Sequence, residues 1–508
     1  MKQKILVYSL AFLIAIGAGF LGSTINNYYN LPVGFGGGGA VGSATNYLAG
    51  SKAGNSLTTG LYNTIIGNKA GYSLTTASFN TFFGEEAGYT NSTTDYLVGI
   101  GYKALYKNTD GYYNMGIGSL AGSELTTGYG NTYVGNFAGQ NSTTSAYNTF
   151  VGNVAGKAIT TGSGNTFIGE AAGLWTTTGS YNIFLGGDTG VYQATQDGNV
   201  FIGMQAGEQN LTGGQLFFAG HHAGQYNTTG GGNTYLGAVS GEQGATGENN
   251  TFVGVTTGYY NKNSNNTFVG AAAGINNRTG TKNNFLGTYS GGFYSAAVTG
   301  TNNVGLGFAS LAALTSGGYN TAVGNYSGYV ATGTTNSNFF GFNSGYWTTG
   351  DRNNLIGFQA GYYLTTGTDN TYVGNYAGFG ANSPKNTGSF NTYIGGNAGR
   401  LTQSGSSNTF IGESTGYNNL TGSSNVFIGY NVGYNETTSN KLYIANSNTA
   451  TPLIYGDFAT GELQINGVLK LVPRVSPTIA SNGMLIASGD GRIYYYNGSA
   501  WRKLATSD

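Results

Sequence analysis

Glycine recurs with a period of 17 residues through most of this chain of 508 residues. From Gly50 to Gly429 the step departs from 17 at four places, namely slips of one residue at Gly270 and Gly357 and insertions before Gly307 and Gly395. A fixed period indicates a repeat architecture, and 17 residues are too few for a helical-hairpin repeat. These recurring glycines, called the column glycines below, divide the chain into 23 repeat units.

Each unit reads Asn-Thr-aromatic-aliphatic-Gly-x-x-Ala-Gly and continues into a polar stretch that often contains Thr-Thr-Gly, as in NTFVGNVAG at residues 148–156. β-Branched and aromatic residues before the column glycine favour a strand. Gly and Asn can supply positive-φ corners. We therefore predict an all-β fold: a parallel β-solenoid or β-roll of about 17-residue coils over residues 46–439, ending in a small C-terminal β cap.

Stacking the coils would place equivalent residues above one another. The Asn column then becomes a hydrogen-bonded side-chain ladder, and the aromatic column becomes a stack. Asn is replaced at Leu97, Leu216 and Ser337, and the second glycine of the unit is replaced at Leu105 and Leu311. The residues predicted to form the structural ladder are Asn63, Asn80, Asn131, Asn148, Asn165, Gly67, Gly84, Gly135, Gly152 and Gly169.

Two neighbouring strand positions are both apolar, as in Phe167 and Ile168. Because neighbours on a strand point to opposite faces, one side chain lies inside the coil and the other points outward. An apolar stripe repeated on every coil marks an interaction surface. We expect the chain to associate with itself as a homotrimer about the rod axis, since a parallel bundle of rods closes by rotation. End-to-end joining of the rods into filaments stays an open alternative.

The repeat resembles the head repeat of trimeric autotransporter adhesins, which has an Asn-Ser-Val-Ala-Ile-Gly type motif. The matching segments are NTFIG at 165–169, NMGIG at 114–118, LVGIGYKAL at 97–105 and NVGLGFASL at 303–311. The resemblance implies a left-handed parallel β-roll with three chains around one axis. The segment at 440–467 resembles the ends of phage tail fibres and of bacterial surface fibres.

Residues 1–23 begin with Lys2 and Lys4 and continue into an uncharged apolar run at 5–21. Two interpretations remain open: a cleaved signal peptide, or an uncleaved membrane anchor that would be the chain's one contact with a membrane. Residues 24–45 read as a Gly-rich linker. Both interpretations predict an extracellular or cell-surface location for the repeats.

Composition argues against several kinds of partner and chemistry. Only 7% of residues are charged, and the 19 basic residues balance the 19 acidic ones, so we expect no nucleic-acid partner. No Cys is present, and acidic residues such as Glu85, Glu170 and Glu413 do not converge, so we expect no enzyme, no metal and no cofactor. His221 and His222 are either ordinary corner residues or, on three chains, a ring of imidazoles.

The segment 440–508 departs from the repeat and reads as a β-rich cap, with a strand meander at 484–504. Its aromatic residues are either receptor contacts or the packed core of the cap: Tyr494, Tyr495, Tyr496 and Trp501. The insertions at 290–301 and 379–390 are expected to leave the coil as surface loops.

These features predict an exported structural fibre or adhesin: a stiff trimeric rod that projects from the cell surface and mediates attachment to a host-surface or matrix ligand, or filament formation. One alternative is a phage-type tail fibre or receptor-binding protein. Another is an ice-binding β-solenoid, suggested by Thr pairs such as Thr143-Thr144.

Overall fold

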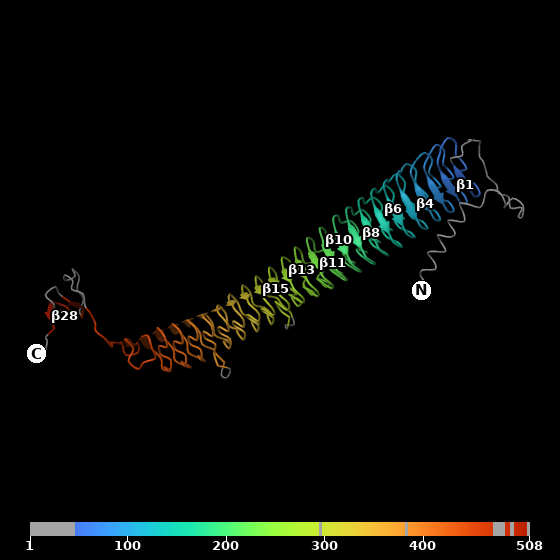
Figure 1. Ribbon diagram of the computed structural model, residues 1–508. Helices are drawn as coiled ribbons and strands as arrows, with labels where there is room; N and C mark the ends of the chain where they lie inside the picture. Colours follow the sequence, from blue (N-terminus) through green and yellow to red (C-terminus); the bar gives the residue numbers. More distant parts are fainter. Residues whose placement is uncertain (1–45, 294–296, 382–384, 471–482, 488–491, 505–508) are drawn as a thin grey trace. The chain divides into compact units, whose positions relative to one another are not determined.

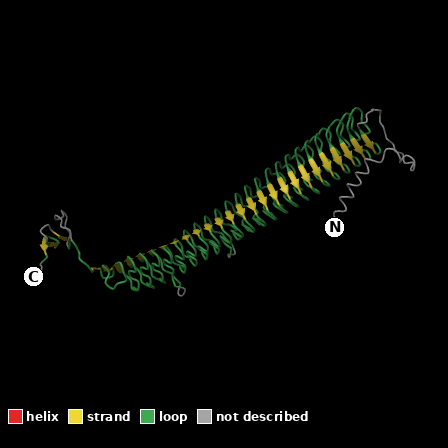
Figure 2. Ribbon diagram, in the orientation of Figure 1, coloured by secondary structure: helices red, strands yellow, loops and turns green. Residues whose placement is uncertain are grey.

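The computed structural model describes residues 46–293, 297–381, 385–470, 483–487 and 492–504 (Figure 1). The segments 1–23 and 24–45 lie outside these residues. The chain divides into two compact units between Asn233 and Thr234. Both are parallel β-solenoids with one three-residue strand per coil, and the described residues contain no helix (Figure 2).

The strands of the first unit are β1 (Tyr47–Ala49), β2 (Thr64–Ile66), β3 (Thr81–Phe83), β4 (Val98–Ile100), β5 (Met115–Ile117), β6 (Thr132–Val134), β7 (Thr149–Val151), β8 (Thr166–Ile168), β9 (Ile183–Leu185), β10 (Val200–Ile202) and β11 (Phe217–Ala219). The solenoid strands of the second unit are β12 (Thr234–Leu236), β13 (Thr251–Val253), β14 (Thr267–Val269), β15 (Asn284–Leu286), β16 (Val304–Leu306), β17 (Thr321–Val323), β18 (Asn338–Phe340), β19 (Asn354–Ile356), β20 (Thr371–Val373), β21 (Thr392–Ile394), β22 (Thr409–Ile411) and β23 (Val426–Ile428).

Within each unit, consecutive strands pair in parallel and in register. Thr149 lies opposite Thr166, and Phe150 lies opposite Phe167. The two insertions leave this register intact, because Asn284 still pairs with Val304 and Thr371 with Thr392. The predicted solenoid and its 17-residue coil are therefore confirmed.

The centre of each strand points into the coil and forms the core. Phe150, Phe167 and Phe184 are fully buried. Successive rings stack with centroids 4.8 Å and 4.6 Å apart. The stack resumes in the second unit, for example from Tyr372 through Tyr393 at 4.7 Å. The core is thus a column of stacked rings that follows the coils.

The two glycines of each 17-residue repeat are required for two different steric reasons. Gly67 has φ +134°, and a Cβ there would collide with the backbone of Gly84 in the next coil. Gly88 has φ +61°, and a Cβ there would collide with the ring of Phe82 in its own coil. The first glycine therefore permits coil stacking, and the second makes room for the inward ring.

The two exceptions to the second glycine follow from this packing. Where the strand centre is Gly99 instead of an aromatic residue, the second glycine is replaced by the fully buried Leu105. A Cβ on Gly116, the centre of the next strand, would lie 3.0 Å from Leu105 Cγ. Gly305 and Leu311 repeat the pairing in the second unit. In these coils a leucine from the opposite wall therefore fills the space that an aromatic ring would otherwise occupy.

The corner before the strand differs from the expectation that Asn would adopt a positive φ there. The left-handed residue is the one before the Asn, with φ of 62° at Tyr62, 62° at Phe79 and 61° at Tyr96. These exposed rings stack on one another, at 5.0 Å and then 5.2 Å. The Asn is instead fully used for hydrogen bonding inside the coil, as described below.

The parallel ladder runs one strand past residue 439. β24 (Lys441–Ile444) pairs in parallel with β23, and Tyr443 extends the inner stack at 5.0 Å from Phe427. β25 (Ile454–Asp457) and β26 (Glu462–Ile465) then add in antiparallel fashion. A separate antiparallel sheet contains β27 (Leu485–Ala487), β28 (Ile493–Tyr496) and β29 (Trp501–Lys503), as the predicted meander required.

Replacing Phe167 by Asp should cost more than about 3 kcal/mol of unfolding free energy, because it removes a buried ring and buries an unpaired charge. The control, Glu170→Ala, changes an exposed corner residue and should stay within about 0.5 kcal/mol. Chemical denaturation of both variants measures the difference. Equal midpoints would contradict the inward placement of Phe167.

The Gly99 and Leu105 pair should behave as a coupled unit. Leu105→Gly leaves a cavity, at a cost of about 2–5 kcal/mol, and Gly99→Phe overpacks the same space, at about 1–3 kcal/mol. The double variant restores the regular unit and should be clearly more stable than the sum of the two changes implies. Additive melting shifts would rule out the proposed size compensation.

Candidate functional site

The Asn residues of the predicted ladder lie in a buried column inside the coils. Asn148 Oδ1 accepts hydrogen bonds from both the backbone N and Nδ2 of Asn165, at 2.9 Å and 3.1 Å. Asn148 Nδ2 donates to the carbonyl of Gly162 at 2.9 Å. One buried amide thus connects its own coil to the next and also holds the return segment. The same pattern brings together Asn63 with Asn80 and Asn131 with Asn148, and the accompanying glycines are Gly67, Gly84, Gly135, Gly152 and Gly169.

The ladder tolerates interruption at the positions where Asn is replaced. The backbone N of Leu97 still donates to Asn80 Oδ1 at 2.9 Å, so the side-chain oxygen of Asn80 in the preceding coil keeps a hydrogen-bond donor. Ser337 both donates from its backbone to Asn320 and accepts from the backbone N of Asn353 through Oγ, at 3.0 Å each. The ladder ends where Lys441 donates to Asn425 Oδ1 at 2.8 Å.

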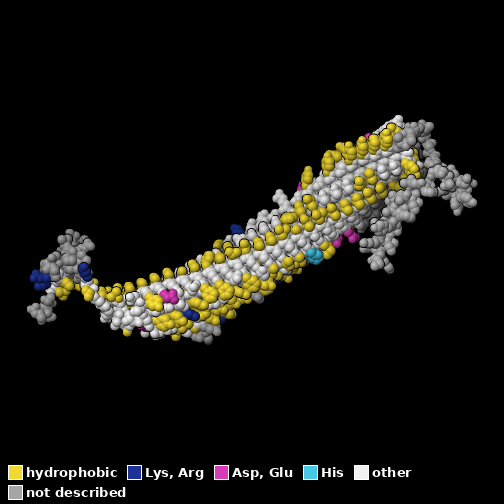
Figure 3. Space-filling model, in the orientation of Figure 1, with side chains coloured by type: hydrophobic (Ala, Val, Ile, Leu, Met, Phe, Trp, Pro, Cys, Tyr) yellow, Lys and Arg dark blue, Asp and Glu magenta, His cyan; other side chains and the backbone are white. Residues whose placement is uncertain are grey.

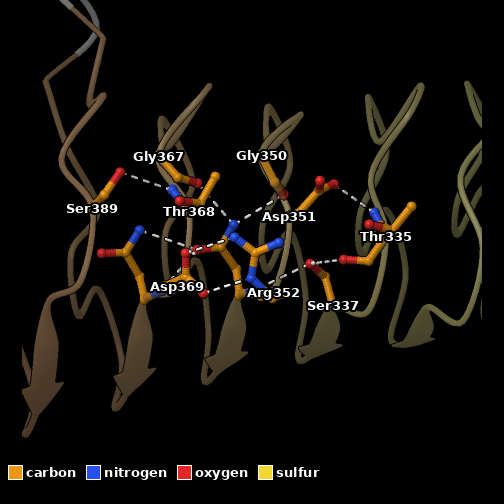
Figure 4. A network of polar contacts seen from close by, with 11 residues as sticks. Thr335, Ser337, Gly350, Asp351, Arg352, Gly367, Thr368, Asp369 and Ser389 are labelled. Carbon is orange, nitrogen blue, oxygen red and sulfur yellow. Dashed lines mark hydrogen bonds and ion pairs between the residues drawn. The ribbon is translucent and has the colours of Figure 1, made fainter.

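A second polar ladder, which the sequence reasoning missed, runs along the neighbouring corner. Figure 4 shows part of it: Thr335 N donates to Asp351 Oδ1 at 2.8 Å, and Thr368 N donates to Ser389 Oγ at 3.0 Å. Arg352 bonds both carboxylate oxygens of Asp369, at 2.6 Å and 2.9 Å, and this lowers the pKa of Asp369. In the sequence, this ladder could have been recognised from the Ser or Asp that stands two residues before the column Asn.

A third column, also missed, lies seven residues after the column glycine. Asn210 and Asn227 are fully buried there, and Asn227 Nδ2 donates to Asn210 Oδ1 at 2.9 Å and to the carbonyl of Gly230 at 2.9 Å. In other coils the same position holds Leu125 or Ile159, so no single residue type recurs there in the sequence. The coil interior is thus polar along one side and aromatic along the other.

The Thr pairs behave as structural elements. The first Thr of each pair donates its hydroxyl to the next coil, as Thr143 Oγ1 does to the carbonyl of Thr160 and Thr160 Oγ1 does to that of Thr177, both at 3.1 Å. The second, such as Thr144, is exposed. Only one Thr of each of these pairs is therefore exposed, as expected for alternating faces, and ice binding by the pairs stays an alternative.

Ion pairs on the first unit are arranged along the coils. Glu86 bridges Lys69 at 3.1 Å and Lys103 at 3.5 Å. The hydrogen bond from Lys69 is the main cause that lowers the pKa of Glu86, and it raises the pKa of Lys69. Because Lys69 and Lys103 are partly exposed, these pairs contribute little stability. Their relevance is that both cations already have a carboxylate partner.

The remaining candidates stay apart from any convergent site. His221 and His222 stack with centroids 3.7 Å apart, and no group of three metal-ligating side chains exists among the described residues. In the small sheet, Tyr494, Tyr496 and Trp501 are half-buried, with Tyr496 and Trp501 5.4 Å apart, whereas Tyr495 is exposed. Whether these rings contact a receptor stays a prediction.

The outward strand position forms an apolar column on the sheet face. Exposure of its side chains reaches 53% at Phe83, 42% at Ile168 and 45% at Leu306. Figure 3 shows rows of hydrophobic side chains that follow the coils on the drawn face. Part of each large side chain is therefore left in water in both units.

Comparison with known proteins adds no relative: no protein-family model matches the chain, and no curated protein and no solved structure matches it significantly. The resemblance to autotransporter heads accordingly stays a prediction beyond the solenoid itself. No helix in the described part of the chain has the length and apolar character to cross a membrane, and residues 5–21 lie outside that part.

Asn148→Ala should destabilise the first unit by at least about 2 kcal/mol, because it leaves the N–H groups of Asn165 and the carbonyl of Gly162 without their buried partner. The control is Asn153→Ala, at an exposed position of the same coil. Denaturation together with hydrogen exchange near residue 165 measures the effect. If both variants keep the parent's stability and protection, the ladder does not hold the coils.

Proposed function

We propose that the protein is an exported, non-enzymatic structural fibre whose rods associate side by side, as a homotrimer, and serve in attachment at the cell surface. The observation that carries this proposal is the outward apolar column. It recurs on the strands of both units, and side chains such as Ile202, Ile356 and Ile411 are left about 40% exposed by the single chain (38%, 42% and 37%). Contiguous apolar surface of this kind favours association.

The sheet face suits a second copy of the same chain. Its outward residues are mainly Thr and an aliphatic side chain, as in Thr166 and Ile168, and carry no charge. Because coils repeat in register, a copy placed parallel meets the same pattern at every step. A three-fold arrangement closes such contacts without leaving a free face, which supports a trimer over an open assembly.

The ladders support a mechanical role. Each coil is joined to the next by backbone pairing, a buried amide and a stacked ring, so bending would have to break several columns together. The apolar segment at 5–21 supports export, and the neutral overall charge gives no support to a nucleic-acid partner. The resemblance of the segment at 440–467 to fibre ends fits the phage-type alternative as well, whereas the apolar segment at 5–21 favours an exported fibre.

Sedimentation of residues 40–508 at micromolar concentration tests the association. We expect a trimer, and a double variant Ile168→Lys with Ile202→Lys should shift it towards monomer without lowering the stability of the coil, because both side chains point outward. The matched control is Thr161→Lys with Thr178→Lys, at exposed positions away from the strand. A parent that sediments as a monomer would refute the proposal.

A further inference from the structure

The residue after the second glycine forms a column of rings in the C-terminal coils of the second unit. Tyr346 stacks on Tyr362 at 5.0 Å, and Tyr362 stacks on Phe379 at 5.4 Å. These side chains are half-buried, so their edges reach the surface. We call the column made by Tyr346, Tyr362, Phe379, Arg400 and Tyr417 the cation–aromatic column.

Arg400 takes the place of a ring in this column. Its Cζ lies 5.7 Å from the centroid of Phe379 and 5.6 Å from that of Tyr417. It also lies 4.6 Å from the ring of Tyr376, and Nη1 donates to Asn397 Oδ1 at 2.8 Å. The guanidinium is thus surrounded by three rings and tied to Asn397, which restricts its position before any ligand arrives.

A second cation comes from the insertion at 379–390. Lys385 Nζ lies 4.0 Å above the ring of Trp347, which is next to Tyr346 in the chain. Residues 382–384 lie outside the described residues, and Lys385 is the first described residue after them. The insertion therefore brings a charge back to the edge of the cation–aromatic column.

Both cations lack a carboxylate partner in the part of the chain that the structure describes. Among the described residues, Arg400 and Lys385 form no ion pair with a carboxylate, whereas Lys69 and Lys103 in the first unit share Glu86. Arg400 uses one N–H for Asn397, so most of its five donors are left for an external acceptor. Arginine binds carboxylates through two parallel N–H bonds, and here the rings already orient that fork.

We propose that the cation–aromatic column binds an acidic polysaccharide, with sugar carboxylates at Arg400 and Lys385 and the apolar faces of the sugar rings against the exposed ring edges. A chain ligand fits because the contacts repeat along the coils. A second copy of this protein fits less well, because its column would add two more cations that lack partners. Rings give large contact area at low entropic cost.

This inference rests on the proposed function, in that it names the ligand of an attachment fibre. The inference and the proposed self-association can be tested separately, because they use different surfaces. The cation–aromatic column lies after the second glycine of each repeat, and the self-association column lies on the strand. A parent protein that sediments as a trimer but does not bind the polysaccharide refutes the inference alone. A monomer that still binds refutes only the self-association.

The test uses the full chain and two probes: polygalacturonate and the same polymer with its carboxylates reduced to alcohols. We expect binding to the first, weakening with salt, and little to the second. The double variant Arg400→Gln with Lys385→Gln should lose at least about tenfold in affinity. The control, Arg278→Gln, removes an arginine that also lies on a ring, 4.9 Å from Tyr260, and should bind as the parent does.

Melting curves check that each variant folds, and Arg400→Lys with Lys385 intact provides a milder variant that should lose less than the double variant. Equal binding of the reduced polymer, unchanged binding by the double variant, or an equal loss in Arg278→Gln would each overturn the proposal. A double variant that changes the sedimentation of the protein instead of its polymer binding would show that the cation–aromatic column is an interface between copies.

Discussion

The in-register stacking of one coil on the next is the constraint on which the rest of the structure depends. A parallel strand of three residues has too few hydrogen bonds to be stable alone, so each coil relies on its neighbours. The buried Asn supplies the missing specificity, because a register slip of one residue would leave its oxygen without two N–H donors and its own amide without a carbonyl. The aromatic column would be broken by the same slip.

The structure of the coil could be predicted from the sequence because the same residue pattern recurs in nearly every repeat. The glycine period, the Asn column and the strand were readable from residues such as Gly67, Asn80 and Phe167. Prediction failed at the corner, where Tyr62 and Phe79 occupy the left-handed region. Propensity alone disfavours such rings there, and their stacking along the coils, a tertiary effect, offsets that preference.

The candidate site was less predictable than the fold. The insertion at 379–390 was singled out by its length, but the return of Lys385 to Trp347 depends on coil stacking that places residues 38 positions apart next to each other. The polar column at Asn210 and Asn227 was hidden because aliphatic residues share its position in other coils. Columns of mixed chemistry are visible only once the coils are aligned in space.

The same repetition divides the surface by role. Most inward strand centres are rings that face a glycine, and the departure at Leu105 comes with a compensating Gly99. Outward positions on the strand are uniform enough for self-association. The turns after the second glycine vary freely, and there the rings gather with Arg400 and the nearby Lys385, neither of which forms an ion pair within the described residues. Specific recognition can therefore arise without disturbing the coil.

Diffraction from oriented, concentrated protein tests the stacking most directly. Coils joined strand to strand predict a strong reflection at about 4.8 Å along the axis of each solenoid. A pattern without this axial reflection would contradict a solenoid whose coils stack strand to strand in register.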